Sequence, residues 1–221
     1  MDARAAQVPD VPVVADTRAQ ASATALGEAF DWRRHVTGIL TVVVALAAGL
    51  ALVPSFVADL AYRDAKVAAD AAYLDEAEAQ ARRAISWTPQ DAYLYKFLGE
   101  IYYRKALFRT EQRRAYLDQA LVALERSTRL NPYEAKTFTS IGWTHLYQGD
   151  ARSAEVAFAK AKVLDPNNPY VRYSLGTAYL WQKKLTQARV ELEFARRYMA
   201  DATEVQAALR EIDRLEGART P

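Results

Sequence analysis

The side chains that could do chemistry in this sequence are few. Only two histidines occur, His35 and His145, and no cysteine is present, which excludes thiol catalysis, disulfides and zinc–thiolate sites. Acidic neighbours occur at Asp75–Glu76 and at Glu76–Glu78, but neighbours so close in sequence do not share one face of a helix. No glycine pattern matches a phosphate-binding loop. We therefore expect no enzyme, no catalytic residue, no cofactor and no metal site.

The composition favours a helical protein. Hydrophobic residues make up 51% of the chain and charged residues 25%, alanine is abundant, and only eight glycines and eight prolines interrupt the sequence. The net charge of +2 is small, and no motif for DNA or RNA is present. We expect no nucleic-acid partner.

One segment is apolar enough to cross a membrane. Residues 36–58 read VTGILTVVVALAAGLALVPSFVA and contain no charge. As a helix this segment would be about 35 Å long, which is sufficient for a bilayer core. A signal peptide would begin nearer the N-terminus and end at a cleavage site of small residues. Here 35 residues precede the segment, and no convincing cleavage site follows it. We predict a single transmembrane helix at 33–58, preceded by a disordered tail at 1–30.

The charges beside this segment bear on its orientation. Arg33 and Arg34 precede it, whereas Arg63 and Lys66 follow it, so the counts of basic residues are equal. The adjacent arginine pair favours a cytoplasmic N-terminus. We therefore expect a plasma (inner) membrane protein whose C-terminal domain lies on the extracytoplasmic, periplasmic side.

The rest of the chain repeats itself. Gly142 and Gly176 are 34 residues apart, as are Pro132 and Pro166. In the same register Ile141 matches Leu175, Leu146 matches Leu180, Ala154 matches Ala188 and Phe158 matches Leu192. This pattern resembles the tetratricopeptide repeat, a helix–turn–helix unit. The resemblance implies an all-α, right-handed superhelical solenoid, with the glycine packed against the partner helix of its own unit.

The spacing also predicts the boundaries of the units. Gly99 precedes Gly142 by 43 residues, nine more than the period, and the extra residues fall between the two helices of that unit. We predict a repeat domain at 59–217. It comprises a degenerate repeat at 59–91, a repeat with a nine-residue insertion at 92–134, repeats at 135–168 and 169–202, and a capping helix at 203–217.

The resemblance also implies a concave ligand surface. In the family, five positions of the first helix of each unit face this surface. In the units that begin at residues 92, 135 and 169, the resemblance assigns these positions to Tyr93, Lys96, Glu100, Tyr103 and Arg104; to Lys136, Thr139, Trp143, Leu146 and Tyr147; and to Tyr170, Tyr173, Thr177, Leu180 and Trp181. Aromatic residues take seven of the fifteen positions, against 11% of the chain. We predict a partner-binding groove made by Tyr93, Lys96, Tyr103, Lys136, Trp143, Tyr147, Tyr170, Tyr173 and Trp181. Some members of the family bind the C-terminal carboxylate of a peptide and need asparagine at the position of Glu100. We therefore do not predict a site for a C-terminal carboxylate here.

A second candidate surface is the lengthened hairpin. Residues 104–114 contain five basic residues and a single acidic residue, Glu111, for a local net charge of +4. The basic residues are Arg104, Lys105, Arg109, Arg113 and Arg114. This basic arm is either a solvated helical turn or a site for an acidic partner or anionic lipid headgroups.

These observations indicate a bacterial, membrane-anchored scaffold that binds protein or peptide partners and aids assembly of a membrane complex. An alternative comes from another class of protein. A transmembrane helix that runs into tetratricopeptide units looks like the C-terminal end of O-antigen ligase or polymerase relatives. The chain would then be an accessory subunit of cell-envelope polysaccharide machinery.

Overall fold

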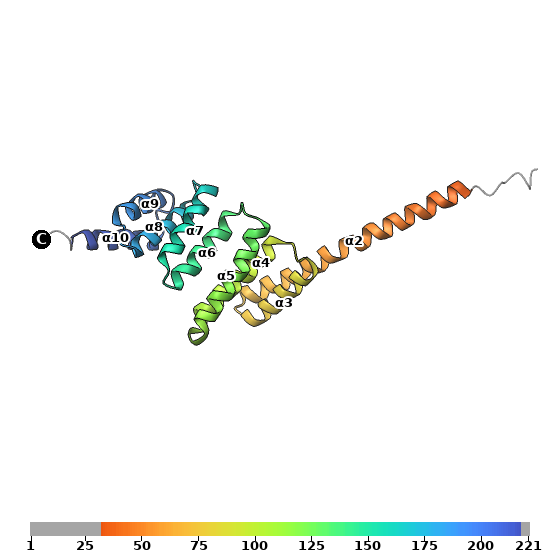
Figure 1. Ribbon diagram of the computed structural model, residues 1–221, viewed down its shortest axis with the longest axis horizontal. Helices are drawn as coiled ribbons and strands as arrows, with labels where there is room; N and C mark the ends of the chain where they lie inside the picture. The colour runs from red at the N-terminus through yellow and green to blue at the C-terminus, as the bar shows by residue number, and fades with distance from the viewer. Residues whose placement is uncertain (1–31, 218–221) are drawn as a thin grey trace, which may run out of the picture. The chain divides into compact units, whose positions relative to one another are not determined.

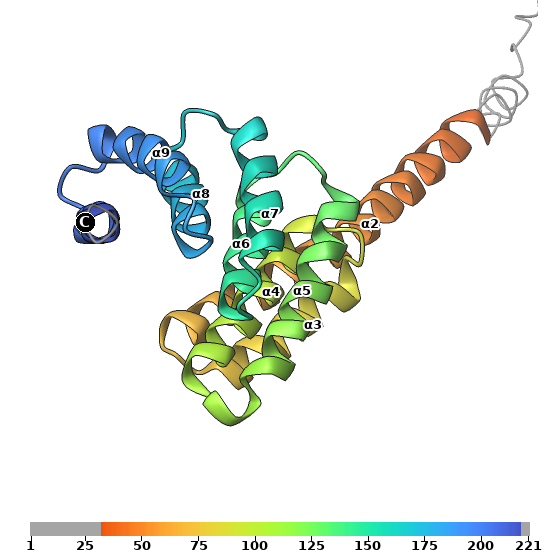
Figure 2. The same ribbon diagram turned by 60° about the vertical axis from the view of Figure 1, so that its left-hand side comes forward.

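The computed structural model describes residues 32–217, and every regular element within this range is a helix. Figures 1 and 2 show these helices following one another as antiparallel pairs. The predicted all-α class is confirmed. The predicted tail at 1–30 lies outside the described residues.

The helices of the repeat region fall into pairs of two lengths. The elements are α2 (Trp32–Asp70), α3 (Leu74–Trp87), α4 (Ala92–Phe108), the short 3-10 helix η1 (Thr110–Gln112), α5 (Arg113–Leu130), α6 (Ala135–Tyr147), α7 (Ala151–Leu164), α8 (Pro169–Trp181), α9 (Leu185–Tyr198) and α10 (Thr203–Gly217). Helices α4 and α5 have 17 and 18 residues, whereas α6 and α7 have 13 and 14. Helices α4 and α5 are therefore each about one turn longer than α6 and α7.

The chain divides into two compact units, residues 1–51 and 52–221. In the part of α2 that belongs to the first unit, large apolar side chains are exposed, with Ile39 at 64% and Leu50 at 71%. The stretch Val36–Asp70 is the one described segment long and apolar enough to cross a membrane. Pro54 lies inside the helix, which does not end there.

Within the second unit, small side chains pack the last part of α2 against the helices that follow it. Alanines 58, 61, 65, 68 and 69 are buried, and each lies three or four residues from another of the set, which places them on one face of α2. They pack in clusters with Ala77, Ala81 and Ala84 of α3 and with leucines of α4. Because alanine has no side chain beyond Cβ, the helix axes can lie close together.

Glycine is required where the two helices of a pair approach most closely. A Cβ atom built on Gly99 would lie 2.6 Å from Cγ of Leu124, and one on Gly176 would lie 2.7 Å from Cγ of Leu192. At Gly142 the added atom would meet the ring of Phe158. These distances are shorter than any non-bonded carbon–carbon contact, so the predicted packing of the repeat glycines against the partner helix is confirmed.

The turns between helices are held by local hydrogen bonds. Asn168 is the N-cap of α8, and its side chain accepts hydrogen bonds from the backbone N–H groups of Tyr170 and Val171, with Pro169 at the first helical position. Gly149 ends α6 with a φ of +84°, the left-handed conformation of a C-cap. Lys183 adopts the same conformation one repeat later, with a φ of +59°.

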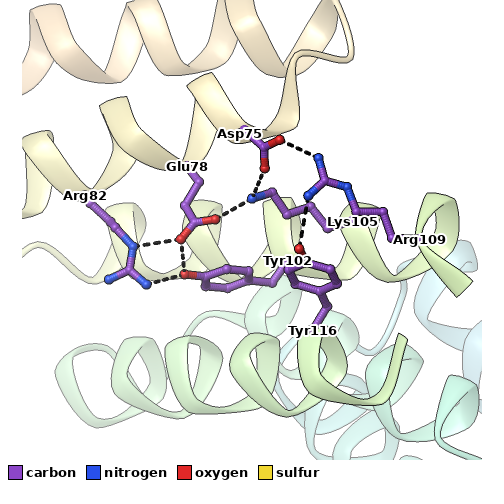
Figure 3. Close-up of polar contacts among 7 residues, drawn as sticks. All are labelled: Asp75, Glu78, Arg82, Tyr102, Lys105, Arg109 and Tyr116. Carbon is purple, nitrogen blue, oxygen red and sulfur yellow. Dashed lines mark hydrogen bonds and ion pairs between the residues drawn. The ribbon is translucent and has the colours of Figure 1, made fainter. Parts of the chain in front are cut away.

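A cluster of charged residues links α3 to the long pair α4–α5 (Figure 3). Lys105 is only 3% exposed in its side chain and binds Asp75 at 2.7 Å and Glu78. Arg109 binds the other oxygen of Asp75 at 2.5 Å. The hydroxyl of Tyr102 donates to Glu78 at 2.7 Å. Helix α3 is thus attached to the next pair by buried charge as well as by apolar packing.

The charges of this cluster shift each other's titration. Hydrogen bonds from Arg109 and Lys105 lower the pKa of Asp75 to about 2. Burial alone would raise the pKa of Glu78, but hydrogen bonds from Lys105 and Tyr102 outweigh it and lower that pKa. Burial and the hydrogen bond to Glu78 raise the pKa of Tyr102 to about 12. All three groups therefore keep their ordinary charge at neutral pH.

Candidate peptide-binding groove

The first helices of successive pairs, α4, α6 and α8, lie side by side and form one layer of the second unit. Two cavities open on this layer, with volumes of about 540 and 450 Å³. Their linings share Tyr103, Trp143 and Tyr170, so the two cavities are neighbours, and together they are called the groove below. The first cavity is lined by Glu100, Tyr103, Arg104, Ala135, Lys136, Thr139, Ser140, Trp143, Asn168, Tyr170 and Val171, and the second by Tyr103, Trp143, Tyr147, Tyr170, Tyr173, Met199, Glu204 and Val205.

Aromatic rings in mutual contact make up the wall of the groove. The rings of Tyr103 and Tyr147 meet edge to face, with centroids 5.2 Å apart. The indole of Trp143 lies 6.4 Å from the ring of Tyr170 and 5.9 Å from that of Tyr173. Tyr147 and Tyr170 are nevertheless 46% and 47% exposed, so part of each ring is open to a ligand. Rings held in place by their neighbours lose little conformational entropy on binding.

The hydroxyls of Tyr103, Tyr170 and Tyr173 remain neutral donors and acceptors. Burial raises the pKa of Tyr103 above its usual range, and the hydroxyl of Tyr147 raises it further. Burial also raises the pKa values of Tyr170 and Tyr173. A ligand therefore meets apolar ring faces with uncharged hydroxyl groups at their edges.

Six of the nine residues predicted for the groove line it: Tyr103, Lys136, Trp143, Tyr147, Tyr170 and Tyr173. The other three lie elsewhere. Lys96 is 5% exposed and binds Glu134 at 2.7 Å, while its ammonium group lies 4.3 Å from the ring centroid of Tyr93. Tyr93 shares a 2.9 Å hydrogen bond with Tyr62 of α2. Trp181 is 59% exposed and lines neither cavity.

The five residues of the predicted basic arm do not form one surface. Lys105 and Arg109 bind acidic groups of α3, as described above. Arg104 lines the groove. Arg113 and Arg114 line a separate hollow near the end of the hairpin. The charge open to a partner is therefore smaller than the sequence total of +4.

Several lining residues are not among those predicted. Glu100 and Thr139 occupy concave positions of the repeat but are not in the predicted set, whereas Ser140 and Asn168 occupy positions outside the concave five. Glu204 and Val205 belong to α10, and Met199 directly follows α9. The repeat register carries no information on Glu204 and Val205, because the capping helix is not a repeat.

No group of three or more metal-ligating side chains occurs in the part of the chain that the structure describes.

Comparison with known proteins agrees with this architecture. Residues 145–212 match the tetratricopeptide repeat family. TTC0263, a thermophilic tetratricopeptide repeat protein of Thermus thermophilus, has 22% identity and a TM-score of 0.61, over 70% of this chain and 80% of that one. The fold is a tetratricopeptide-repeat solenoid.

Two further solved structures share the solenoid. MamA has 14% identity and a TM-score of 0.60, over 74% of this chain and 84% of that one. The first tetratricopeptide repeat domain of Spaghetti (RPAP3), bound to the HSP90 peptide SRMEEVD, has 19% identity and a TM-score of 0.52, over 58% of this chain and 94% of that one. At these identities the likeness establishes the fold alone. No curated protein matches the chain significantly.

Proposed function

We propose that this protein is a membrane-anchored scaffold whose groove binds a peptide segment of a partner protein. The observation that carries the proposal is the groove, in which Trp143 and four tyrosines present partly exposed rings. Aromatic anchors in a concave surface supply most of the binding energy in many protein interfaces. The tetratricopeptide domain of RPAP3 binds a peptide, which supports the same role here.

The groove is tested with exposed tyrosines, which can be changed without opening the core. We expect the Tyr147→Ala/Tyr170→Ala variant to lose at least roughly ten-fold of its partner binding, because both rings are anchor candidates. The partners are the proteins that co-purify with the full chain from its own cells, quantified by mass spectrometry.

The matched control is Tyr133→Ala/Tyr198→Ala. These two tyrosines are 80% and 68% exposed and lie outside the groove. The control should retain the wild-type partners, and both variants should keep the wild-type helical circular dichroism. If the groove variant retains the same partners at the same level as wild type, the groove is not the binding site.

Membrane anchoring is the second part of the proposal, and it is supported by the exposed apolar side chains of residues 36–53. We expect the full chain to stay in the membrane pellet after extraction with alkaline carbonate, because about 20 apolar residues suffice to span the bilayer. The Leu46→Arg/Leu50→Arg variant should shift into the soluble fraction, since each central arginine costs about 3 kcal/mol for insertion. A soluble wild-type chain would contradict the anchor.

The side of the membrane is proposed from the arginine pair before the segment. Protease added to intact spheroplasts should then digest the tetratricopeptide domain, and full protection would reverse the orientation. Assembly of a membrane complex follows from the two parts together, since a tethered groove concentrates its partner at the membrane. The alternative role in polysaccharide machinery stays a prediction.

A further inference from the structure

The larger cavity of the groove contains an acidic side chain, Glu100, that has no cationic partner among the described residues. Glu100 projects from the middle of α4. Its carboxylate accepts a long hydrogen bond from the hydroxyl of Ser140, at 3.4 Å. No Lys, Arg or His nitrogen of the described residues lies within 4.0 Å of it. Glu78 is also largely buried, but unlike Glu100 it is paired with Lys105 and Arg82.

The charged groups around Glu100 are held by other partners or lie at the rim. Lys96, one turn away on α4, binds Glu134 instead. Lys136 of α6 is exposed, and Arg104 makes no ion pair among the described residues although it lines the same cavity. Burial raises the pKa of Glu100, and Glu134 adds to this effect, while Lys96, Ser140 and Lys136 counteract it. The carboxylate is therefore poorly compensated in the free protein.

We propose that the groove selects peptide segments that carry a lysine or arginine side chain, which forms an ion pair with Glu100. This inference rests on the proposed peptide-binding function and names the chemistry of its ligand. The geometry around Glu100 suits such a side chain. Its alkyl part would pack on the rings of Tyr103, Trp143 and Tyr170, which line the same cavity, and its charge would reach the carboxylate.

The rim cations set a further condition on the ligand. Lys136 and Arg104 disfavour a segment that is basic throughout, although Lys136 is exposed and its charge is screened by solvent. Acidic residues beside the central base would meet these rim groups. The favoured segment is therefore one basic residue with an acidic neighbour, and not a polybasic run.

The test uses the full chain in a mild detergent and an array of randomised heptapeptides with acetylated N-termini and amidated C-termini, so that only side chains carry charge. Wild type should retain peptides enriched in Lys or Arg at one position. The strongest binder is then measured by fluorescence anisotropy, together with its analogue in which norleucine replaces the basic residue. For wild type, we expect the norleucine analogue to bind roughly ten-fold or more weakly than the parent peptide. For the Glu100→Gln variant, the affinities of the two peptides should differ by less than about two-fold.

The matched control is Glu125→Gln, an acidic residue of α5 that is 59% exposed and outside the groove, and it should behave as wild type. Bound peptides without a preference for Lys or Arg would overturn the inference and leave the proposed function standing. An equal loss on norleucine replacement in wild type and Glu100→Gln would do the same. Failure of every peptide to bind would overturn the proposed function and this inference with it.

Discussion

Replacing Asp75 and Glu78 together by Asn and Gln should destabilise the domain by about 3–5 kcal/mol at pH 7, because it leaves the buried ammonium of Lys105 without a counter-charge. Lys105 is 3% exposed in its side chain, and its two anionic partners are these carboxylates of α3. The thermal midpoint measured by circular dichroism on the full chain should fall by roughly 10 °C. Figure 3 shows both carboxylates directed at the one lysine.

Two further variants separate ion pairing from other effects. Glu76→Gln removes an exposed charge from the same first turn of α3 and should change stability by less than about 0.5 kcal/mol. Adding Lys105→Met to the double variant should recover most of the loss, because an apolar side chain of similar length suits the same site. If Lys105→Met brings no recovery, the stranded charge is not the cause.

The same cluster predicts acid sensitivity with a definite sign. The pKa values of Asp75 and Glu78 are lower in the folded protein than in an unfolded chain, and that of Asp75 is about 2. Such groups stabilise the fold above their unfolded pKa of about 4, and this contribution disappears as the pH falls toward 2. Wild type should therefore lose more stability between pH 5 and pH 3 than the variant lacking both carboxylates.

Changing Gly142 to Leu should destabilise the domain by about 3 kcal/mol, in spite of the gain in helix propensity. The first added carbon would lie 2.7 Å from Cζ of Phe158. Phe158 is fully buried and packs against Leu146 and Leu175, so its ring has no free space to move into. The measurement is again the thermal midpoint of the full chain.

Controls distinguish the overlap from a general effect of leucine. Lys136→Leu places the same side chain on an exposed position of α6 and should stay within about 0.5 kcal/mol of wild type. In the Phe158→Ala background the ring is gone, so Gly142→Leu should cost less than it does in wild type. Strict additivity of the two changes would mean that these residues do not touch.

The repeat pattern is predictable because it depends on local spacing. The sequence itself contains the repeat glycines Gly99, Gly142 and Gly176, a proline shortly before each of α4, α6 and α8, and an N-cap such as Asn168. Each acts within one helix pair, where the geometry of a helical hairpin is nearly constant. The close approach at Gly142 follows from the same regularity.

The burial and the ion-pair partners of the charged residues are not predictable from local spacing. The acidic residues one or two positions apart, Asp75–Glu76 and Glu76–Glu78, do not bind a common partner, whereas Asp75 and Glu78 share a helix face and both bind Lys105. The prediction that Lys105 belongs to an exposed basic arm is wrong, because its burial depends on how α3 crosses α4. That crossing depends on side chains distant in sequence, such as Ala77 and Ala81 of α3 and Leu98 and Ile101 of α4, and no short motif contains them together.

By itself, then, the sequence determined an all-α repeat architecture, the order of its helix pairs and an apolar segment before them. Only the tertiary structure decided which residues of the concave positions are available to a ligand. Lys96 and Tyr103 both occupy such positions, yet Lys96 is buried against Glu134 and Tyr103 lines the groove. The physical reason is that a position in a repeat specifies the direction of a side chain, whereas its exposure depends on what the neighbouring helix places opposite it.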